Sequence, residues 1–323
     1  MDSKKGDGVR LELAEAFEKP GPYTMSYGFN LDILCESIRK VGLINPPLVS
    51  RNRDGVFEIV SGYRRIMALR TLGELQIFCY DVTQALRSPA ERFFAAFYEN
   101  LATRKFNDVE KAILLAGLQD YVTREEILTS YMPLLSLPSH EGTLKSYMKL
   151  LDLEENVRNA IAVEELSMNV AKALVEMEKD SRQTLFHWIQ MLKLNFNYQS
   201  KFVEYLQDIS ARENVKPSEA LSERSCSQII ENPRLNTPQK AKAVLEVLRA
   251  RRSPRLAQAQ AIVERNLSAI SLPKDASIHY DPGLEDPYYH LDVRFRHGED
   301  LKKTIDELHR LDELEAIPAM WAT

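Results

Sequence analysis

The chain has 323 residues, about twice the size that one hydrophobic core usually serves, so we expect two or three domains. Hydrophobic residues make up 44% and charged residues 28%, which is typical of a folded soluble protein, and no apolar run is long enough to cross a bilayer. The net charge of -5 gives no overall attraction to nucleic acid, and three cysteines without a C-x-x-C pair argue against a zinc knuckle or a disulfide framework.

The first part of the chain alternates short helical and extended patterns. Apolar residues at helical spacing predict a helix over 31–41 that ends at Gly42. Two prolines then force an extended backbone, and the later Asp-Gly pair suits the turn of a hairpin. The expected elements that follow are strands at 48–50 and 57–60, a helix at 64–72 and a strand at 76–81. We therefore predict an α+β domain over residues 1–105.

From about residue 89 onward the pattern becomes helical and stays so. Candidate helices, split by prolines and short polar turns, cover 90–101, 109–122, 124–131, 143–151, 154–163, 170–178 and 181–208. Short helices with tight joints are typical of helix-turn-helix units, so we predict an all-α helix-turn-helix-like domain over 106–212. That segment carries 11 basic and 16 acidic side chains, which is a net charge of -5.

The remainder of the chain predicts a linker and a small third domain. Residues 210–238 are polar and carry three prolines, which indicates loose packing, and basic helices are expected at 239–251 and 253–267. We assign residues 213–268 to this linker and its basic helices. Two alternating segments around a Pro-Gly turn, followed by an amphipathic helix, predict a ββα domain over 269–323.

The residues Gly62, Tyr63, Arg64 and Arg65 stand where the predicted strand 57–60 passes into the next predicted helix. Such a turn offers unpaired backbone N–H groups and the positive end of the helix dipole, and glycine lets an anion approach the backbone closely. Two adjacent guanidinium groups can add bidentate contacts to phosphate oxygens. The pattern predicts a phosphate-binding turn, and the alternative is a pair of solvated arginines on a helix surface.

A second polar pair, Glu99 and Asn100, stands at the end of an otherwise apolar helix further along the chain. A carboxylate beside a carboxamide is suitable chemistry for holding Mg²⁺, or its water shell, next to a polyphosphate. The alternative is that both side chains only cap the joint between two domains.

Three motifs in this order carry a resemblance to a known family. They are S-I-R-x-x-G-L-x-x-P at 37–46, G-x-R-R at 62–65, and E-N-L at 99–101 followed by N-x-x-E-x-A at 107–112. Together with the helices that follow, they resemble the ParB partition-protein family over roughly residues 30–210. The N-terminal nucleotide-binding fold of that family is shared with sulfiredoxin.

The resemblance implies a homodimer that binds CTP, or another nucleoside triphosphate, with Mg²⁺. It also implies a DNA clamp that loads at a specific site, closes and slides, as in chromosome or plasmid partition. By the same resemblance, the phosphates are contacted by the segment that holds Gly62, Tyr63, Arg64 and Arg65. The residues Glu99 and Asn100 serve the phosphates and the metal, and the pocket is lined by Gly42, Leu43, Asn45 and Pro46.

Two stretches depart from the family pattern. The family usually follows Glu-Asn with two residues and an arginine; here Thr103 holds that place and Arg104 comes one residue later, so Arg104 is the candidate for that phosphate contact. The family's Asn-Pro-x-Gln-x-Arg stretch is absent, and residues 18–30 read EKPGPYTMSYGFN instead. This departure puts hydrolysis in question more than binding, so we expect at most a slow CTPase.

The helix expected to read DNA, EGTLKSYMKLLDL at 141–153, is poor in positive charge. It offers Lys145 and Lys149 and the hydroxyl groups of Thr143, Ser146 and Tyr147. The segment 234–265, with eight Lys and Arg side chains against two Glu, includes Arg251 and Arg252 and can supply non-specific phosphate contacts. The alternatives are a pair of solvated helices and a helical scaffold that no longer reads DNA.

Two other functions stay open at this point. One is a nucleotide-dependent phosphotransferase on the same fold, similar to kinases of a free amino acid, with Glu12, Glu15 or Glu18 as the base. The other is an adaptor whose acidic helical domain and ββα domain bind proteins, with only weak affinity for DNA. In each case the sequence predicts a bacterial cytoplasmic protein, associated with the nucleoid if it binds DNA, with no membrane partner.

Overall fold

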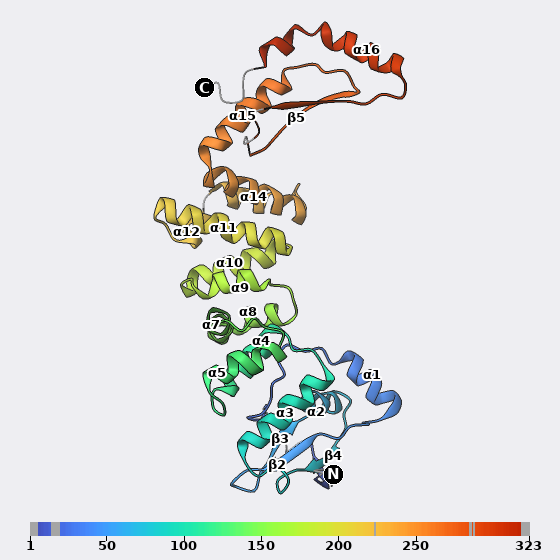
Figure 1. Cartoon of the computed structure of the whole chain (residues 1–323), viewed down its shortest axis with the longest axis vertical. Coiled ribbons are helices and arrows are strands. Elements are labelled where there is room, and N and C mark those ends of the chain that lie inside the picture. The colour runs from blue at the N-terminus through green and yellow to red at the C-terminus, as the bar shows by residue number, and fades with distance from the viewer. Residues whose placement is uncertain (1–5, 14–19, 223, 284–285, 287, 318–323) are drawn as a thin grey trace. The chain divides into compact units, whose positions relative to one another are not determined.

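A computed structural model describes residues 6–13, 20–222, 224–283, 286 and 288–317. The chain forms two compact units, residues 1–178 and residues 179–323, and each is described by itself (Figure 1). The first unit holds a four-stranded sheet with helices, and the second is helical apart from one two-stranded sheet. This mixture of elements confirms the predicted α+β fold class.

The four-stranded sheet of the first unit has the order β1-β4-β2-β3. Its strands are β1 (Asp7–Glu12), β2 (Leu48–Arg51), β3 (Phe57–Ser61) and β4 (Gln76–Asp81). The pairs β1–β4 and β2–β3 are antiparallel, while β2 and β4 run parallel. The strands β2, β3 and β4 confirm the predicted ones, whereas β1 was not anticipated.

Three helices pack around this sheet, namely α1 (Asp32–Val41), α2 (Tyr63–Thr71) and α3 (Pro89–Thr103). The core between sheet and helices contains fully buried Val49, Ile59 and Ile66, at 0 to 1% exposure. Helix α3 begins at a capping box in which the Ser88 hydroxyl accepts from the Glu91 amide, with proline at the first helical position. Because β3 leads directly into α2, the core fixes the position of the strand-to-helix turn.

The remaining helices of the first unit are short, as predicted. They are α4 (Asp108–Leu118), α5 (Arg124–Glu126), the π-helical turn η1 (Ile127–Tyr131), α6 (Met132–Leu134), α7 (Glu141–Lys149), the 3₁₀ turn η2 (Leu150–Asp152), α8 (Glu155–Ala162) and α9 (Met168–Val175). Helix α4 packs against α7, α8 and η2 and buries several aliphatic side chains completely. It is therefore the central helix of this group.

The described residues of the second unit form six helices before its small sheet. They are α10 (Lys179–Met191), α11 (Phe196–Glu213), α12 (Pro217–Leu221), α13 (Arg224–Glu231), α14 (Thr237–Arg252) and α15 (Pro254–Ser268). The strands β5 (Ala276–Tyr280) and β6 (Tyr289–Val293) form an antiparallel pair, followed by α16 (Gly298–His309) and the 3₁₀ turn η3 (Asp312–Ala316). The order of β5, β6 and α16 confirms the expected ββα elements.

Two expectations about the second unit were wrong. The predicted helix 181–208 is two helices, because Lys193 has a positive φ of 50° and Asn195 caps the start of α11. The segment 210–238 is not a plain linker, since it contains α12 and α13. Two of its three prolines, Pro217 and Pro238, stand in the first turns of α12 and α14, where the missing N–H costs nothing, and Pro233 lies in the turn between α13 and α14. The predicted domain boundaries stay predictions.

Among the described residues, no helix combines the length and the apolar character that a membrane crossing requires.

Candidate functional site

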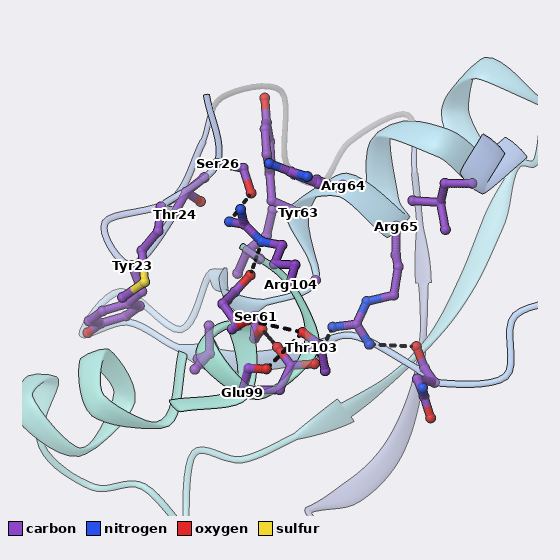
Figure 2. Close-up of a pocket in the computed structure, with 17 residues that line it drawn as sticks. Tyr23, Thr24, Ser26, Ser61, Tyr63, Arg64, Arg65, Glu99, Thr103 and Arg104 are labelled. Carbon is purple, nitrogen blue, oxygen red and sulfur yellow. Dashed lines mark hydrogen bonds and ion pairs between the residues drawn. The ribbon is translucent and has the colours of Figure 1, made fainter. Parts of the chain in front are cut away.

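A cavity of about 230 Å³ lies where β3 ends and α2 begins, against α3 and residues 23–26 (Figure 2). Polar side chains from four separate segments converge on it. The described residues that line it are Tyr23, Thr24, Met25, Ser26, Leu34, Asn45, Ile59, Val60, Ser61, Gly62, Tyr63, Arg64, Arg65, Glu99, Asn100, Thr103 and Arg104.

The strand-to-helix turn at Gly62 forms one wall of the cavity. Gly62 has a φ of 101°, and a Cβ at this position would lie 2.8 Å from the Cβ of Pro47, so only glycine fits. No side chain caps the helix that starts here. The positive end of α2 is therefore available to an anion in the cavity.

The guanidinium of Arg65 lies between two acceptors at the edge of the cavity. It donates to the backbone oxygen of Asn45 at 2.8 Å and to Glu99 Oε1 at 2.6 Å. The second carboxylate oxygen of Glu99 accepts from the hydroxyl of Ser61. Asn45, Arg65 and Glu99 were proposed for the site from the sequence, whereas Ser61 was not.

The guanidinium groups of Arg64 and Arg104 share one carboxylate, that of Glu110 on α4. Arg64 pairs with Oε1 at 2.5 Å and Arg104 with Oε2 at 2.6 Å, and the Glu110 side chain is completely buried. Burial lowers the pKa of Arg104, and the Glu110 carboxylate opposes that shift. The Arg64 guanidinium also stacks over the Phe29 ring, 4.9 Å from its centroid.

The side chain of Asn100 supports Arg104. Its Oδ1 accepts from Arg104 Nε at 2.8 Å, and its Nδ2 donates to the backbone oxygen of Ala96 at 2.8 Å.

No cluster of three or more His, Cys, Asp or Glu side chains able to hold a metal occurs in the part of the chain that the structure describes. Glu99, whose side chain is 33% exposed, is thus the carboxylate that a metal beside a bound phosphate could reach.

Two buried polar atoms at the cavity have no hydrogen-bond partner among the described residues. They are Thr24 Oγ1 and Arg64 Nε. An unsatisfied buried donor or acceptor costs about 1–3 kcal/mol, so such atoms mark a place where a polar ligand restores the missing bonds. The cavity is chemically suited to an anion, because both of these atoms can donate a hydrogen bond to it.

Most of the predicted pocket residues do meet at this cavity. The predicted residues that line it are Asn45, Gly62, Tyr63, Arg64, Arg65, Glu99, Asn100 and Arg104. Gly42, in contrast, ends α1 and is not among the described lining residues. Sequence reasoning missed the role of Glu110. Its signal was present in the N-x-x-E motif at 107–110, which forms a capping box at the start of α4.

The predicted DNA-reading helix α7 presents little free positive charge. Lys145 is exposed, but Lys149 pairs with Glu176 at 2.6 Å. The Tyr147 hydroxyl is not available as expected, because it is buried and donates to Asp108 at 2.8 Å. The remaining hydroxyl groups belong to half-buried Thr143 and Ser146, and the latter donates to the Gly142 backbone oxygen at 2.8 Å.

The two arginines proposed for phosphate contacts in the second unit also have internal partners. Arg251 Nε donates to Glu213 Oε2 at 3.0 Å and Nη1 donates to the backbone oxygen of Ala220 at 3.0 Å. Arg252 pairs with Asp208 at 2.6 Å and with Glu204 at 2.9 Å. These contacts occupy two of the eight basic side chains of the segment 234–265 and argue against the predicted role of both arginines.

The carboxylates proposed for a phosphotransferase base gain no support. Glu12 lies on β1, where its Oε1 accepts from Gln76 at 2.5 Å, and it is not among the described residues of the cavity. Glu15 and Glu18 lie outside the described residues.

This geometry defines a cationic pocket domain followed in the chain by helices of the helix-turn-helix type. Residues 22–100 match the model of the ParB N-terminal domain, and residues 134–208 match the model of the ParB HTH domain. These two matches confirm the resemblance to the ParB family, because the chain carries regions that match its N-terminal domain and its helix-turn-helix domain, in that order.

Individual relatives agree with this family. The chain is 26% identical over 232 residues to the probable chromosome-partitioning protein ParB of Vibrio cholerae, a match that covers 70% of this chain and 75% of that protein. It is 27% identical over 168 residues to a nucleoid occlusion protein of Halalkalibacterium halodurans, covering 50% and 55%. A match to the chromosome-partitioning protein ParB of Myxococcus xanthus has 31% identity over 160 residues, covering 49% and 51%. Two of these matches thus span about half of the relative.

Solved structures of truncated ParB from Caulobacter crescentus are also similar. One, in complex with CTP-gamma-S, has 21% identity and a TM-score of 0.26, and the match covers 53% of this chain and 92% of that one. Another, bound to the centromeric parS site, has 19% identity and a TM-score of 0.32, covering 59% and 96%.

Proposed function

We propose that the cavity binds the phosphates of a nucleoside triphosphate, with CTP as the nucleotide that the ParB resemblance implies. The observation that carries this proposal is the convergence of Arg64, Arg65 and Arg104 with the amide end of α2 on one cavity. These three guanidinium groups pair with only two carboxylates, so the cluster keeps a positive charge for a polyphosphate. Arginine forks also match the geometry of phosphate oxygens.

The size and lining of the cavity indicate which part of the nucleotide it encloses. Its volume of about 230 Å³ is below the range of roughly 300–1,000 Å³ that encloses a whole drug-sized ligand. The enclosed, cationic part therefore suits the phosphate chain. The apolar side chains of Met25, Leu34 and Ile59 line the same cavity and offer a surface for the less polar part of the nucleotide.

Mg²⁺ fits this site through one protein carboxylate. Glu99 would hold the ion together with phosphate oxygens and water, which is the usual arrangement for magnesium at nucleotides. Asn100 would reach the ion only after its Oδ1 had released Arg104 Nε. The charge that Mg²⁺ supplies would offset part of the charge of the phosphates.

We further propose that nucleotide binding regulates DNA binding by a dimer, as in a clamp of the chromosome-partition type. Support comes from the ParB HTH match at residues 134–208 and from exposed Lys145 on α7. Hydrolysis, if it occurs, is slow, because the family's Asn-Pro-x-Gln-x-Arg stretch is replaced in this chain. The ββα end of the chain is available to a protein partner or to a second copy.

The test is calorimetric titration of the full chain with CTP, ATP, GTP and UTP, each with Mg²⁺. We expect CTP to bind most tightly, and Arg65→Ala to weaken binding by about 10- to 100-fold, since bonds to charged groups contribute about 1.5–3 kcal/mol each. Arg39→Ala, an exposed arginine on α1, serves as the control that removes a charge away from the cavity. Absence of binding at millimolar nucleotide, or full affinity in Arg65→Ala, would remove the proposal.

One observation favours a second function, a ParB-like adaptor that has lost DNA recognition. Two cations near the predicted reading helix are paired, Lys149 with Glu176 and Arg124 with Glu141. Binding to duplex DNA at low salt separates the two functions, because an adaptor would show only weak affinity with no preference for sequence.

A further inference from the structure

Residues 23–29 form a short strap with two different sides. Residues 23–26 line the cavity, Tyr27 and Gly28 meet the helices that follow the sheet domain, and the Phe29 ring lies against Tyr63 and Arg64 of α2. The strap therefore contacts both the cavity and the helical part of the first unit, and the strap, α4 and α8 all belong to that unit.

The cavity side of the strap is polar and incomplete. Tyr23 and Met25 are buried, while Thr24 Oγ1 is buried without a partner among the described residues. The Ser26 hydroxyl accepts from Arg104 Nη2 at 3.2 Å. In Figure 2 the strap residues Thr24 and Ser26 stand on the same side of the cavity as Arg64 and Arg104. A ligand there would supply the partner that Thr24 lacks.

The opposite side of the strap docks on α4 and α8. The Tyr27 carbonyl accepts from Asn107 Nδ2 at 2.8 Å, and the Arg158 guanidinium lies over the Tyr27 ring, 5.5 Å from its centroid. Gly28 has a φ of 56°, and a Cβ built there would lie 2.4 Å from the Cβ of Ala162. The strap and α8 are thus in direct contact, with no room for a larger side chain.

Glu110 joins these two sides. Its carboxylate accepts from the guanidinium groups of Arg64 and Arg104, from the Tyr27 amide at 3.1 Å, and from the Asn107 amide at 3.1 Å. One buried carboxylate thus holds two cavity arginines, the strap and the first turn of α4. A change in the position of either arginine must alter the bonds that fix Tyr27.

We propose that Glu110 and the strap couple occupancy of the cavity to α4 and α8, with Glu110 as a positioning residue. The inference rests on the proposed function, because it takes a nucleoside triphosphate as the ligand. Phosphate oxygens that pair with Arg64 and Arg104 compete with the Glu110 carboxylate for the same donors. A ligand bond to Thr24 orders the strap from its other side, and the strap carries this change to α8.

The test is hydrogen exchange of the full chain with and without CTP and Mg²⁺, with nucleotide affinity measured separately by calorimetry. For the wild type we expect slower exchange in residues 23–29 and also in α8, by up to about tenfold at a ligand concentration ten times the Kd. Gly28→Ala should lose the protection of α8 and keep the nucleotide affinity, since Gly28 is not among the described lining residues. Gly55→Ala is the matched control, because Gly55 also has a positive φ, 79°, but has open space around it.

The possible outcomes separate the proposal that the cavity binds a nucleotide from the proposal that Glu110 and the strap couple the cavity to α8. Nucleotide binding without protection of α8 in the wild type overturns the coupling and leaves the binding proposal standing. Protection of α8 that persists in Gly28→Ala also overturns the coupling. No binding of any nucleotide overturns both. Tyr27→Leu, which removes the ring below Arg158 and keeps the backbone bonds, gives a second reading if Gly28→Ala does not fold.

Discussion

Arg64 and Glu110 stand 46 residues apart in the sequence and form an ion pair in which the carboxylate is fully buried. Arg104 binds the other oxygen of the same carboxylate, so two positive charges depend on one negative charge. Taking such a group out of water is costly, and the arrangement persists only while every partner is present. The site domain and α4 are therefore held together by a charge cluster that tolerates no deletion of Glu110.

Replacing this carboxylate should destabilise the protein strongly. We expect Glu110→Ala to lower the free energy of unfolding by about 3 kcal/mol, because two largely buried guanidinium groups lose their counter-charge. Glu36→Ala is the control: Glu36 pairs with Lys40 on the surface of α1, where both side chains are mostly exposed, and should cost less than about 0.5 kcal/mol. Urea denaturation measures both. An equal loss of unfolding free energy in the two variants would contradict the role of Glu110 as a buried counter-charge for two arginines.

The two glycines that flank α2 offer a second test. Gly62 and Gly73 both have positive φ, 101° and 79°, but only Gly62 is crowded, by Pro47. We expect Gly73→Ala to cost about 1 kcal/mol from backbone strain, and Gly62→Ala about 3 kcal/mol, since its Cβ must also displace the proline. Urea denaturation of each variant decides the matter. A cost for Gly62→Ala no larger than that for Gly73→Ala would show that Pro47 moves away freely.

The strand-to-helix turn at Gly62 was predictable because its signals are local. A strand, a glycine and a helix with two arginines in its first turn are neighbours in the sequence, and the structure keeps Gly62, Arg64 and Arg65 at that turn. Their partners were harder to predict. Glu99 and Glu110 reach these arginines only through the tertiary fold, and a capping motif at Glu110 gives no information on which distant arginines it binds.

The missed elements have similar causes. Strand β1 is short and largely exposed, and its pairing with β4 is set by contacts between distant parts of the sequence. The break between α10 and α11 depends on Lys193 in a left-handed conformation, for which lysine gives no sequence signal. Pro217 was interpreted as a linker residue, whereas proline also suits the first turn of a helix, as in α12.

Charge pairing on the helical domain makes a prediction about DNA. Glu176→Gln removes the partner of Lys149 and should strengthen binding to duplex DNA at low salt. If Lys149 then contacts one more phosphate, the slope of log affinity against log salt becomes steeper by about 0.9. Fluorescence anisotropy at several salt concentrations measures this slope. Glu36→Gln removes the same charge on α1, which is distant from α7 in the sequence, and so controls for the change in net charge. An unchanged slope would speak against α7 as the DNA-contacting helix.

The alkaline side of the stability profile should depend on Cys79. This thiol is fully buried in β4; burial raises its pKa from the ordinary 9.0 to about 12, and the Arg65 guanidinium opposes the shift. Between these two values the unfolded chain loses the thiol proton and the folded chain keeps it. The contribution of this thiol to the free energy of unfolding is therefore fully present below about pH 9 and is lost as the pH rises. At pH 10 the loss from this group is about 1.4 kcal/mol. Urea denaturation at pH 7, 9 and 10 measures it, and Cys79→Ala should flatten the profile by that amount whatever its stability at pH 7. The same decline in both proteins would mean that other groups control the alkaline limit.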